Sequence, residues 1–282
     1  MNSKAIKRQL LAAIAMVLVA ALALGSSTYA WFVASGTVKA EGMKVQAKSE
    51  GGLAIRWAGE TSELWGTTAS AKMTEAKALL PASTADLAKW TYAKASSASA
   101  SAADTKTYST ITGKVFAGTD GAYTANDYVV MQPFEVRSTA KDKLAQGLYI
   151  SAVTVTGSNA KDLDPALRVG VRLVTDDGYS GNFIYAPVTG ADEDYSWKDA
   201  SNSNAATAVT LAEVGTDTND KSQLISSSTN IPFDKGSAVK VQIFIWYEGE
   251  DESLYSNNFA VNALSVSVDF TSYGLAGTPT ST

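Results

Sequence analysis

The sequence predicts an all-β protein: a jelly-roll-like β-sandwich with long decorated loops and one short helix, preceded by an N-terminal apolar helix. Two observations lead to this prediction. Short apolar runs alternate with turn residues along most of the chain. Two C-terminal runs also alternate apolar and polar residues with a period of two, which is typical of strands that bury one face.

Strand-like runs occur from residue 37 to residue 270. In Val239–Tyr247, Phe244 and Trp246 lie on the face opposite the aliphatic residues, so we expect this strand to be central or covered. Leu264–Phe270 carries serines on its second face, which we expect to face water. The other predicted strands are Thr37–Ala47, Leu53–Ala58, Tyr128–Val136, Leu148–Thr156, Arg168–Thr175 and Phe183–Val188.

Three stretches interrupt the strand pattern. Ser83-Thr84-Ala85-Asp86 is typical of a capping box, so a short helix is predicted at Leu87–Lys94. The Ala/Ser-rich residues 95–103 and residues 201–206 are expected to be loops. We therefore expect one sandwich domain over residues 39–282 with an insertion near residues 60–125. The alternative is a division into two sandwiches.

The first 30 residues have the layout of a secretory signal peptide. Three basic residues precede an unbroken run of 15 apolar residues, Leu10–Leu24. Thr28 and Ala30 supply small residues at −3 and −1, so cleavage is predicted between Ala30 and Trp31. The alternative is a retained membrane anchor, because residues 10–34 together are long enough to span a bilayer. In both cases we expect the rest of the chain outside the cytoplasm.

The composition excludes several classes of chemistry. The chain has no cysteine and no histidine, so Cys–His pairs, Ser-His-Asp triads and histidine-ligated metal sites are impossible. Residues 31–282 carry 20 basic and 28 acidic residues without a basic cluster, so we expect no nucleic-acid binding. Membrane contact is expected only through the signal segment. The carboxylates Glu248 and Glu250 are adjacent on a predicted turn, with no sign of a catalytic cleft, so we predict that the protein is not an enzyme.

Acidic clusters supply the candidate metal ligands. Calcium prefers several hard oxygen ligands, which makes Asp176, Asp177, Asp217 and Asp220 calcium candidates. None of the clusters has the full spacing of a calcium loop, so the alternative is a set of solvated loop ends. No other cofactor is expected. Further acidic residues occur at Asp192-Glu193-Asp194 and at Glu248, Glu250, Asp251 and Glu252.

Three tryptophans in loop-like sequence suggest another class of function. Trp65, Trp90 and Trp197 would serve as stacking platforms in a secreted carbohydrate-binding or adhesive surface module, because exposed indole rings stack on sugars and anchor partners. The alternative is that these rings pack partly against the core.

A motif pattern surrounds the predicted cleavage site. Ser27-Thr28-Tyr29-Ala30-Trp31-Phe32 is followed by Ala34-Ser35-Gly36-Thr37-Val38. Within residues 20–55 this pattern resembles the export and first-strand region of TasA/camelysin-like proteins. The resemblance implies a jelly-roll subunit of a bacterial extracellular fibre, matured by a dedicated signal peptidase, whose N-terminal segment completes the sheet of the next subunit.

The resemblance has limits elsewhere in the chain. Ile245-Trp246-Tyr247-Glu248-Gly249-Glu250-Asp251 resembles uncharacterised exported proteins of anaerobic Gram-positive bacteria. The Ala/Ser-rich insertion departs from the family pattern. The metalloprotease activity attributed to camelysin is not implied, because this chain has no histidine.

Residues 31–38 are therefore predicted to be a donor strand. Trp31, Phe32 and Val33 form an apolar new N-terminus and, with Val38, are the expected subunit contacts, because an extended segment can add to an open sheet edge. Head-to-tail donation does not close on itself and builds a filament. We expect a secreted homopolymer of an extracellular filament or biofilm matrix, with accessory fibre subunits as further partners. The alternative is that Trp31–Val38 folds back onto its own domain as an edge strand.

Overall fold

The computed structural model describes residues 38–40, 44–49, 52–58, 65–71, 77–95, 106–111, 128–139, 146–156, 165–175, 178–187, 191, 194–198, 207–210, 223–230, 238–251 and 265–273. All the regular secondary structure within these ranges is β-strand, which confirms the predicted all-β class. A search of the same residues for a helix of membrane-spanning length and hydropathy found none. The predicted signal segment lies outside the described residues.

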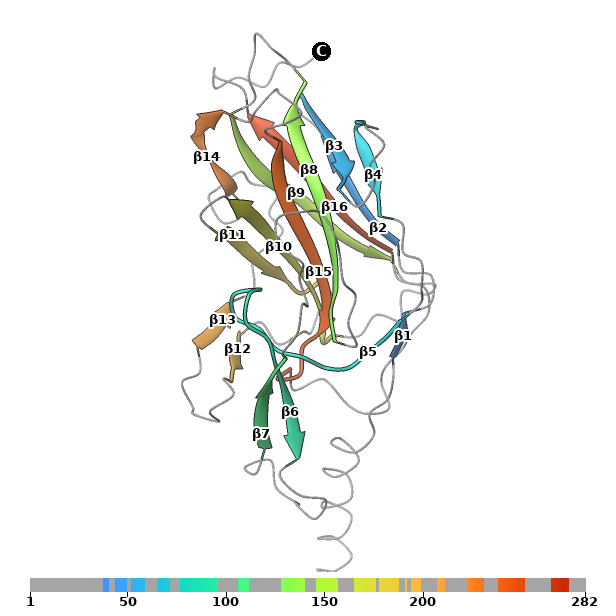
Figure 1. Ribbon diagram of the computed structural model, residues 1–282, viewed down its shortest axis with the longest axis vertical. Helices are drawn as coiled ribbons and strands as arrows, with labels where there is room; N and C mark the ends of the chain where they lie inside the picture. Colours follow the sequence, from blue (N-terminus) through green and yellow to red (C-terminus); the bar gives the residue numbers. More distant parts are fainter. Residues whose placement is uncertain are drawn as a thin grey trace, which may run out of the picture.

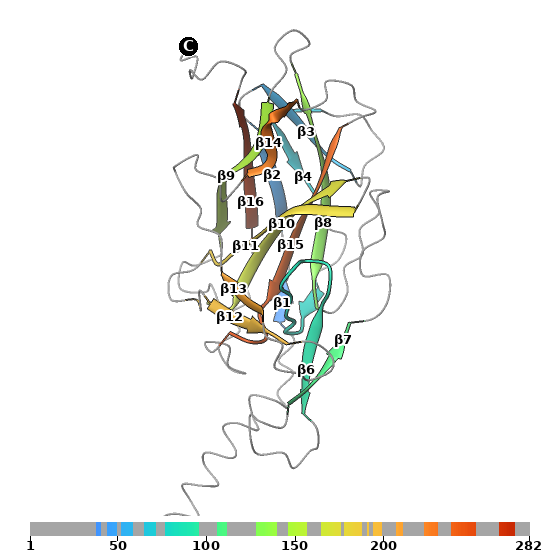
Figure 2. The same cartoon turned by 90° about the vertical axis from the view of Figure 1, so that its left-hand side faces the viewer.

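Two five-stranded sheets form the body of the molecule (Figures 1 and 2). Sheet I has the strand order β11-β10-β15-β8-β3 and is antiparallel throughout. Its strands are β3 (Leu53–Trp57), β8 (Val130–Ser138), β10 (Leu167–Thr175), β11 (Gly178–Tyr185) and β15 (Val239–Tyr247). Sheet II has the order β14-β9-β16-β2-β4 and contains one parallel pairing, between β16 and β2. Its strands are β2 (Lys44–Ser49), β4 (Thr68–Ser70), β9 (Gln146–Thr156), β14 (Gln223–Asn230) and β16 (Ser265–Tyr273).

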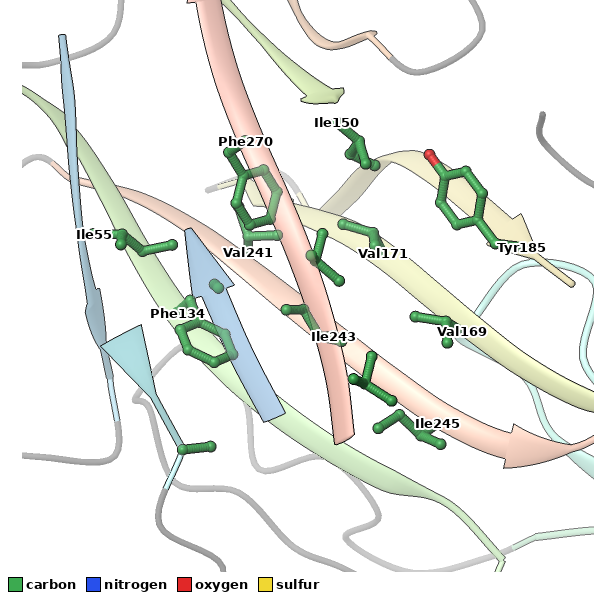
Figure 3. Packing of buried hydrophobic residues seen from close by; sticks show 14 of the residues in the cluster. Ile55, Phe134, Ile150, Val169, Val171, Tyr185, Val241, Ile243, Ile245 and Phe270 are labelled. Atoms are coloured by element: carbon green, nitrogen blue, oxygen red, sulfur yellow. The ribbon is translucent and has the colours of Figure 1, made fainter. Parts of the chain in front are cut away.

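The main core lies between the two sheets. Because side chains alternate across a strand, every second residue of β15 points inward: Val241, Ile243, Ile245 and Tyr247 are all buried in one cluster. Val266, Val268 and Phe270 of β16, in sheet II, belong to the same cluster. Figure 3 shows Phe270 together with Val241, Ile243 and Ile245. The period-two pattern in the sequence therefore identified the inward face of both strands correctly.

The outer face of sheet I is buried as well. Phe244 and Trp246 are fully buried in a second cluster, as the sequence predicts for a covered strand. Their cover has two parts. One is the segment 81–90, which we call the strap. The other is the hairpin of β12 (Asp194–Trp197) and β13 (Thr207–Thr210). Leu87 and Trp90 of the strap, and Tyr195 and Val209 of the hairpin, belong to this cluster.

The strap is fixed to sheet I by shape and by hydrogen bonds. A Cβ atom on Gly170 would lie 2.6 Å from Leu87 Cδ2, so Leu87 packs directly over the bare backbone of that glycine. The buried Arg172 donates from Nη1 to the Leu87 carbonyl at 2.5 Å and from Nε and Nη2 to Gln242 Oε1 at 3.1 and 2.7 Å. The strap is thus held at its middle by a β10 side chain that is itself anchored to β15.

The predicted helix at Leu87–Lys94 is wrong. Thr84 Oγ1 accepts hydrogen bonds from the amides of Asp86 and Leu87, and Asp86 Oδ1 accepts from those of Ala88 and Lys89. These are the contacts of a cap, but they close a turn, because Leu87 has φ = 55° and a left-handed residue ends helical geometry. The chain then continues as β6 (Thr91–Ala95), which pairs with β7 (Lys106–Thr110).

The predicted strand Thr37–Ala47 divides into two strands with different partners. β1 (Val38–Ala40) pairs with β5 (Lys77–Leu79) in a two-stranded ribbon outside the main sheets. β2 enters sheet II between the central strand β16 and the edge strand β4. The ribbon therefore holds the chain immediately before it enters the sandwich.

Candidate functional site

The N-terminal ribbon is the described element nearest to the predicted donor segment. Val38 pairs with Leu79, Lys39 with Ala78 and Ala40 with Lys77. Leu79 has no exposed surface and belongs to the core between the sheets, so β5 is anchored in the sandwich. Within the described residues β1 pairs only with β5. A three-residue ribbon of this kind has little stability of its own and depends on this anchor.

The residues predicted to form subunit contacts are only partly described. The structure places the backbone of Val38 against Leu79 of the same chain. Trp31, Phe32 and Val33 lie outside the described residues, as does the predicted cleavage site between Ala30 and Trp31. Val38 is thus the junction between the predicted donor segment and the sandwich.

A buried polar cluster lies where the strap crosses the end of β15. Glu248 follows the last residue of β15 and has no exposed surface. It forms an isolated parallel bridge with Ala82 of the strap: the Ala82 amide donates to the Tyr247 carbonyl at 3.0 Å, and the Gly249 amide donates to the Ala82 carbonyl at 2.9 Å. On its other side the Glu248 amide donates to the Ala166 carbonyl at 2.8 Å.

The carboxylate of Glu248 is held by neutral donors. Trp246 Nε1 donates to Oε2 at 3.2 Å, and the Glu250 amide donates to Oε1 at 3.1 Å. The Ser83 hydroxyl is close enough to lower the pKa of Glu248, although it makes no well-formed hydrogen bond within the described residues. Tyr195 also faces the carboxylate, and its hydroxyl donates to the Thr84 carbonyl at 2.9 Å.

The cluster contains two acidic groups and one basic group. Arg168 and Asp251 are both fully buried and form an ion pair at 2.5 Å. Arg168 Nη1 is bonded to the carbonyls of Pro165 and Leu167, and its guanidinium carbon lies 5.4 Å from the ring centre of Tyr195. Since Asp251 already neutralises Arg168, an ionised Glu248 adds one uncompensated negative charge.

The pKa values in the cluster reflect this imbalance. Burial raises the pKa of Glu248 from 4.5 to about 7, against the lowering effects of Ser83, Arg168 and its own hydrogen bonds. Burial, followed by the charge of Glu248, also raises the pKa of Tyr195 well above 10. Charging Glu248 is therefore unfavourable in the folded protein.

Sequence analysis did not identify this cluster. It placed Glu248 on a predicted turn beside Glu250, whereas the Glu248 carboxyl is buried and does not face solvent. A usable signal was present in the sequence. Phe244, Trp246 and Glu248 share one face by the period-two rule, so a cover over the first two residues extends to the third.

The three candidate sugar platforms are engaged within the chain. Trp90 is 2 % exposed and packs edge-on against Trp246, with ring centres 5.1 Å apart. Trp197 is partly buried and donates from Nε1 to the Ser83 carbonyl at 3.2 Å. Trp65 is also partly buried, with the guanidinium carbons of Arg56 and Arg137 at 5.0 and 4.8 Å from its ring centre. All three rings thus have structural roles within the described part of the chain.

The calcium candidates Asp176, Asp177, Asp217 and Asp220 lie outside the described residues. In the part of the chain that the structure describes, no group of three or more acidic side chains is arranged to hold a metal ion. The calcium prediction therefore rests on the sequence alone.

Comparison of the chain with protein-family models, curated proteins and solved structures found no match. The function is therefore inferred from the residues and their geometry.

Proposed function

We propose that the protein is a secreted structural subunit of an extracellular filament or biofilm matrix. In this proposal the predicted donor segment, residues 31–38, stays attached to its own sandwich through Val38 and adds as a strand to the next copy. Repetition of this contact forms a homopolymer. A dedicated signal peptidase would expose the segment, and accessory fibre subunits would join the same chain.

The observation that supports this proposal best is the position of the N-terminal ribbon. The predicted donor segment is followed at once by β1, whose pairing to β5 is anchored in the core by Leu79. A donated strand holds two subunits together only if the residues that connect it to its own subunit are fixed in place. The β1–β5 ribbon fixes these residues outside the two main sheets.

Sheet II also has an edge suited to accept a strand. Among the described strands β14 and β4 are its two edges, and β14 is the longer one, with eight residues against three. The backbone groups on the open side of an edge strand are available to an added strand. We therefore place the acceptor at the β14 edge of the neighbouring copy.

The proposal predicts that Trp31→Ser combined with Phe32→Ser abolishes filaments. The exported variant should remain folded and monomeric, because the core between the sheets is built by strands that follow residue 37, while the donor strand loses its two largest apolar side chains. Sedimentation velocity, negative-stain microscopy and a thermal melt on one preparation give assembly state and stability together.

The matched control exchanges the two rings, as Trp31→Phe with Phe32→Trp. It keeps the apolar area and should still form filaments. Normal filaments from the double serine variant would contradict donor-strand assembly. A variant that loses stability without any change in assembly would indicate instead that the segment folds back onto its own domain.

A further inference from the structure

The strap connects the β1–β5 ribbon to the β6–β7 hairpin. At its start it continues from β5, which holds β1, and at its end it continues into β6. Between these points it contacts the Glu248 cluster (Ser83, Arg168, Tyr195, Glu248 and Asp251) through Ser83 and through the bridge of Ala82 to Glu248. Any change in this cluster therefore acts on the attachment of the strap.

The charge count makes the attachment depend on one proton. With Glu248 ionised, the buried groups are two carboxylates and one guanidinium, and Arg168 is already committed to Asp251. With Glu248 protonated, the cluster is neutral. The Ser83 hydroxyl lowers the pKa of Glu248, so the advantage of the neutral form comes from the burial of the carboxyl beneath the strap and not from Ser83.

The charges that face Glu248 come from every element packed around it. Arg168 belongs to β10, Tyr195 to β12, and Asp251 to the turn after β15, while the strap contributes the hydroxyl of Ser83. The charged residues of the strap, Asp86 and Lys89, are not among the groups that act on Glu248. Among these described groups, Arg168 is the basic one. The strap therefore brings no compensating charge to an ionised Glu248.

We propose that Glu248 is a proton-controlled clasp for the strap: protonated, it holds residues 81–90 against sheet I, and ionised, it favours their local release. Release requires no unfolding of the sandwich, because the core between the sheets is a separate cluster from the one that contains the strap. The inference does not depend on filament formation.

Amide hydrogen exchange of the full chain in mild detergent tests the clasp. The reporting amides are those of Ala82, Ser83 and Thr91, which donate to the carbonyls of Tyr247, Thr91 and Ser83. For a carboxyl whose pKa falls from about 7 in the clasped state to 4.5 on release, linkage gives an about thirtyfold loss of protection between pH 5.5 and pH 8.5. Exchange rates are corrected for intrinsic pH dependence, and amides of Val241 and Ile243 in β15 are the internal reference.

Three variants separate the clasp from a general effect of pH. Glu248→Gln should retain protection at both pH values. Glu135→Gln, which changes a carboxyl of sheet I that is paired with Arg56, should behave as wild type. Trp197→Phe, a change outside the Glu248 cluster, removes the hydrogen bond from Nε1 to the Ser83 carbonyl of the strap and should lower protection equally at both pH values.

Two results would overturn the clasp. One is equal protection of the strap at pH 5.5 and pH 8.5 in the wild-type protein. The other is the same loss in Glu248→Gln as in wild type. If Glu248→Gln does not fold, the pH dependence of strap protection in the wild-type protein still tests the clasp. Titration of Glu248 requires a midpoint near pH 7, and a loss of protection with another midpoint would contradict it.

Discussion

The pKa of Glu248 shows how strongly the ionisation of one side chain depends on the residues that cover it. Its carboxyl is an ordinary group at the end of a strand, and exposure would leave it ionised at neutral pH. The strap and β12 remove it from water and supply only uncharged donors, so its pKa rises to about 7. Gly170 is the opposite case: its missing side chain makes room for Leu87.

The raised pKa has a definite consequence for stability. Between pH 4.5 and about 7 the folded protein retains a proton that the unfolded chain releases, so the free energy of unfolding falls as pH rises through this window. Below pH 4.5 both states are protonated and the effect disappears. Glu248→Gln removes this dependence, so its stability relative to wild type should rise by about 3 kcal/mol from pH 4.5 to pH 8.

Urea unfolding of both proteins across this pH range measures the difference. Glu135→Gln serves as the control, because its carboxyl lies outside the Glu248 cluster. A constant difference between Glu248→Gln and wild type at all pH values would contradict the proposed burial of an ionisable Glu248.

At the scale of elements, the contact between the strap and β10 is the tightest described here. Gly170→Ala should destabilise the protein by about 1–3 kcal/mol, because its new Cβ would lie 2.6 Å from Leu87 Cδ2 and 3.0 Å from Trp246. Chemical denaturation measures the loss.

Gly249→Ala is the matched control for this substitution. Its nearest contact would be Pro81 at 3.6 Å, so the substitution should have little effect. Leu87→Ala should cost less stability in the Gly170→Ala background than in wild type, because the new Cβ overlaps the space that Leu87 leaves. If Gly170→Ala were as stable as wild type, the strap would not be packed as described.

The strands show what could be predicted from the sequence. The period-two pattern located β15 and β16, and the ring side chains of Phe244 and Trp246 predicted a cover. The capping-box pattern of Ser83–Asp86 predicted a helix at Leu87–Lys94, because residues such as Thr84 and Asp86 are also good helix caps. The helix does not form because Leu87 has a left-handed backbone conformation and packs over Gly170. The sequence around Leu87 cannot predict a contact with a residue more than 80 positions away.

The same limit applied to the candidate site. The pattern that placed Phe244 and Trp246 under a cover could have been extended to Glu248. Its partner Arg168 could not have been found in this way, since the pairing with Asp251 depends on how β10 and β15 align. The division of residues 37–47 into β1 and β2 likewise depends on the distant partners β5 and β16.

At the scale of the whole molecule, binding of calcium to the predicted aspartates should stabilise the fold. With calcium at about 100 times its dissociation constant, the stabilisation is about 2.7 kcal/mol. We expect a higher melting temperature with calcium chloride than with EDTA. The double substitution Asp176→Asn with Asp177→Asn, compared with Asp217→Asn with Asp220→Asn, identifies the pair that binds. An unchanged melting temperature in EDTA would refute the calcium prediction.

The parallel pairing of β2 with β16 has a consequence for the order of folding. It joins Lys44 to Ser265, and β16 also forms the only described connection between β2 and β9. Contacts between residues roughly 220 positions apart form slowly, because a long stretch of chain must be ordered first. Sheet II therefore cannot be completed until its C-terminal strand has emerged. A chain that is threaded through a translocation pore from its N-terminus would stay open during passage and complete its fold only on the far side.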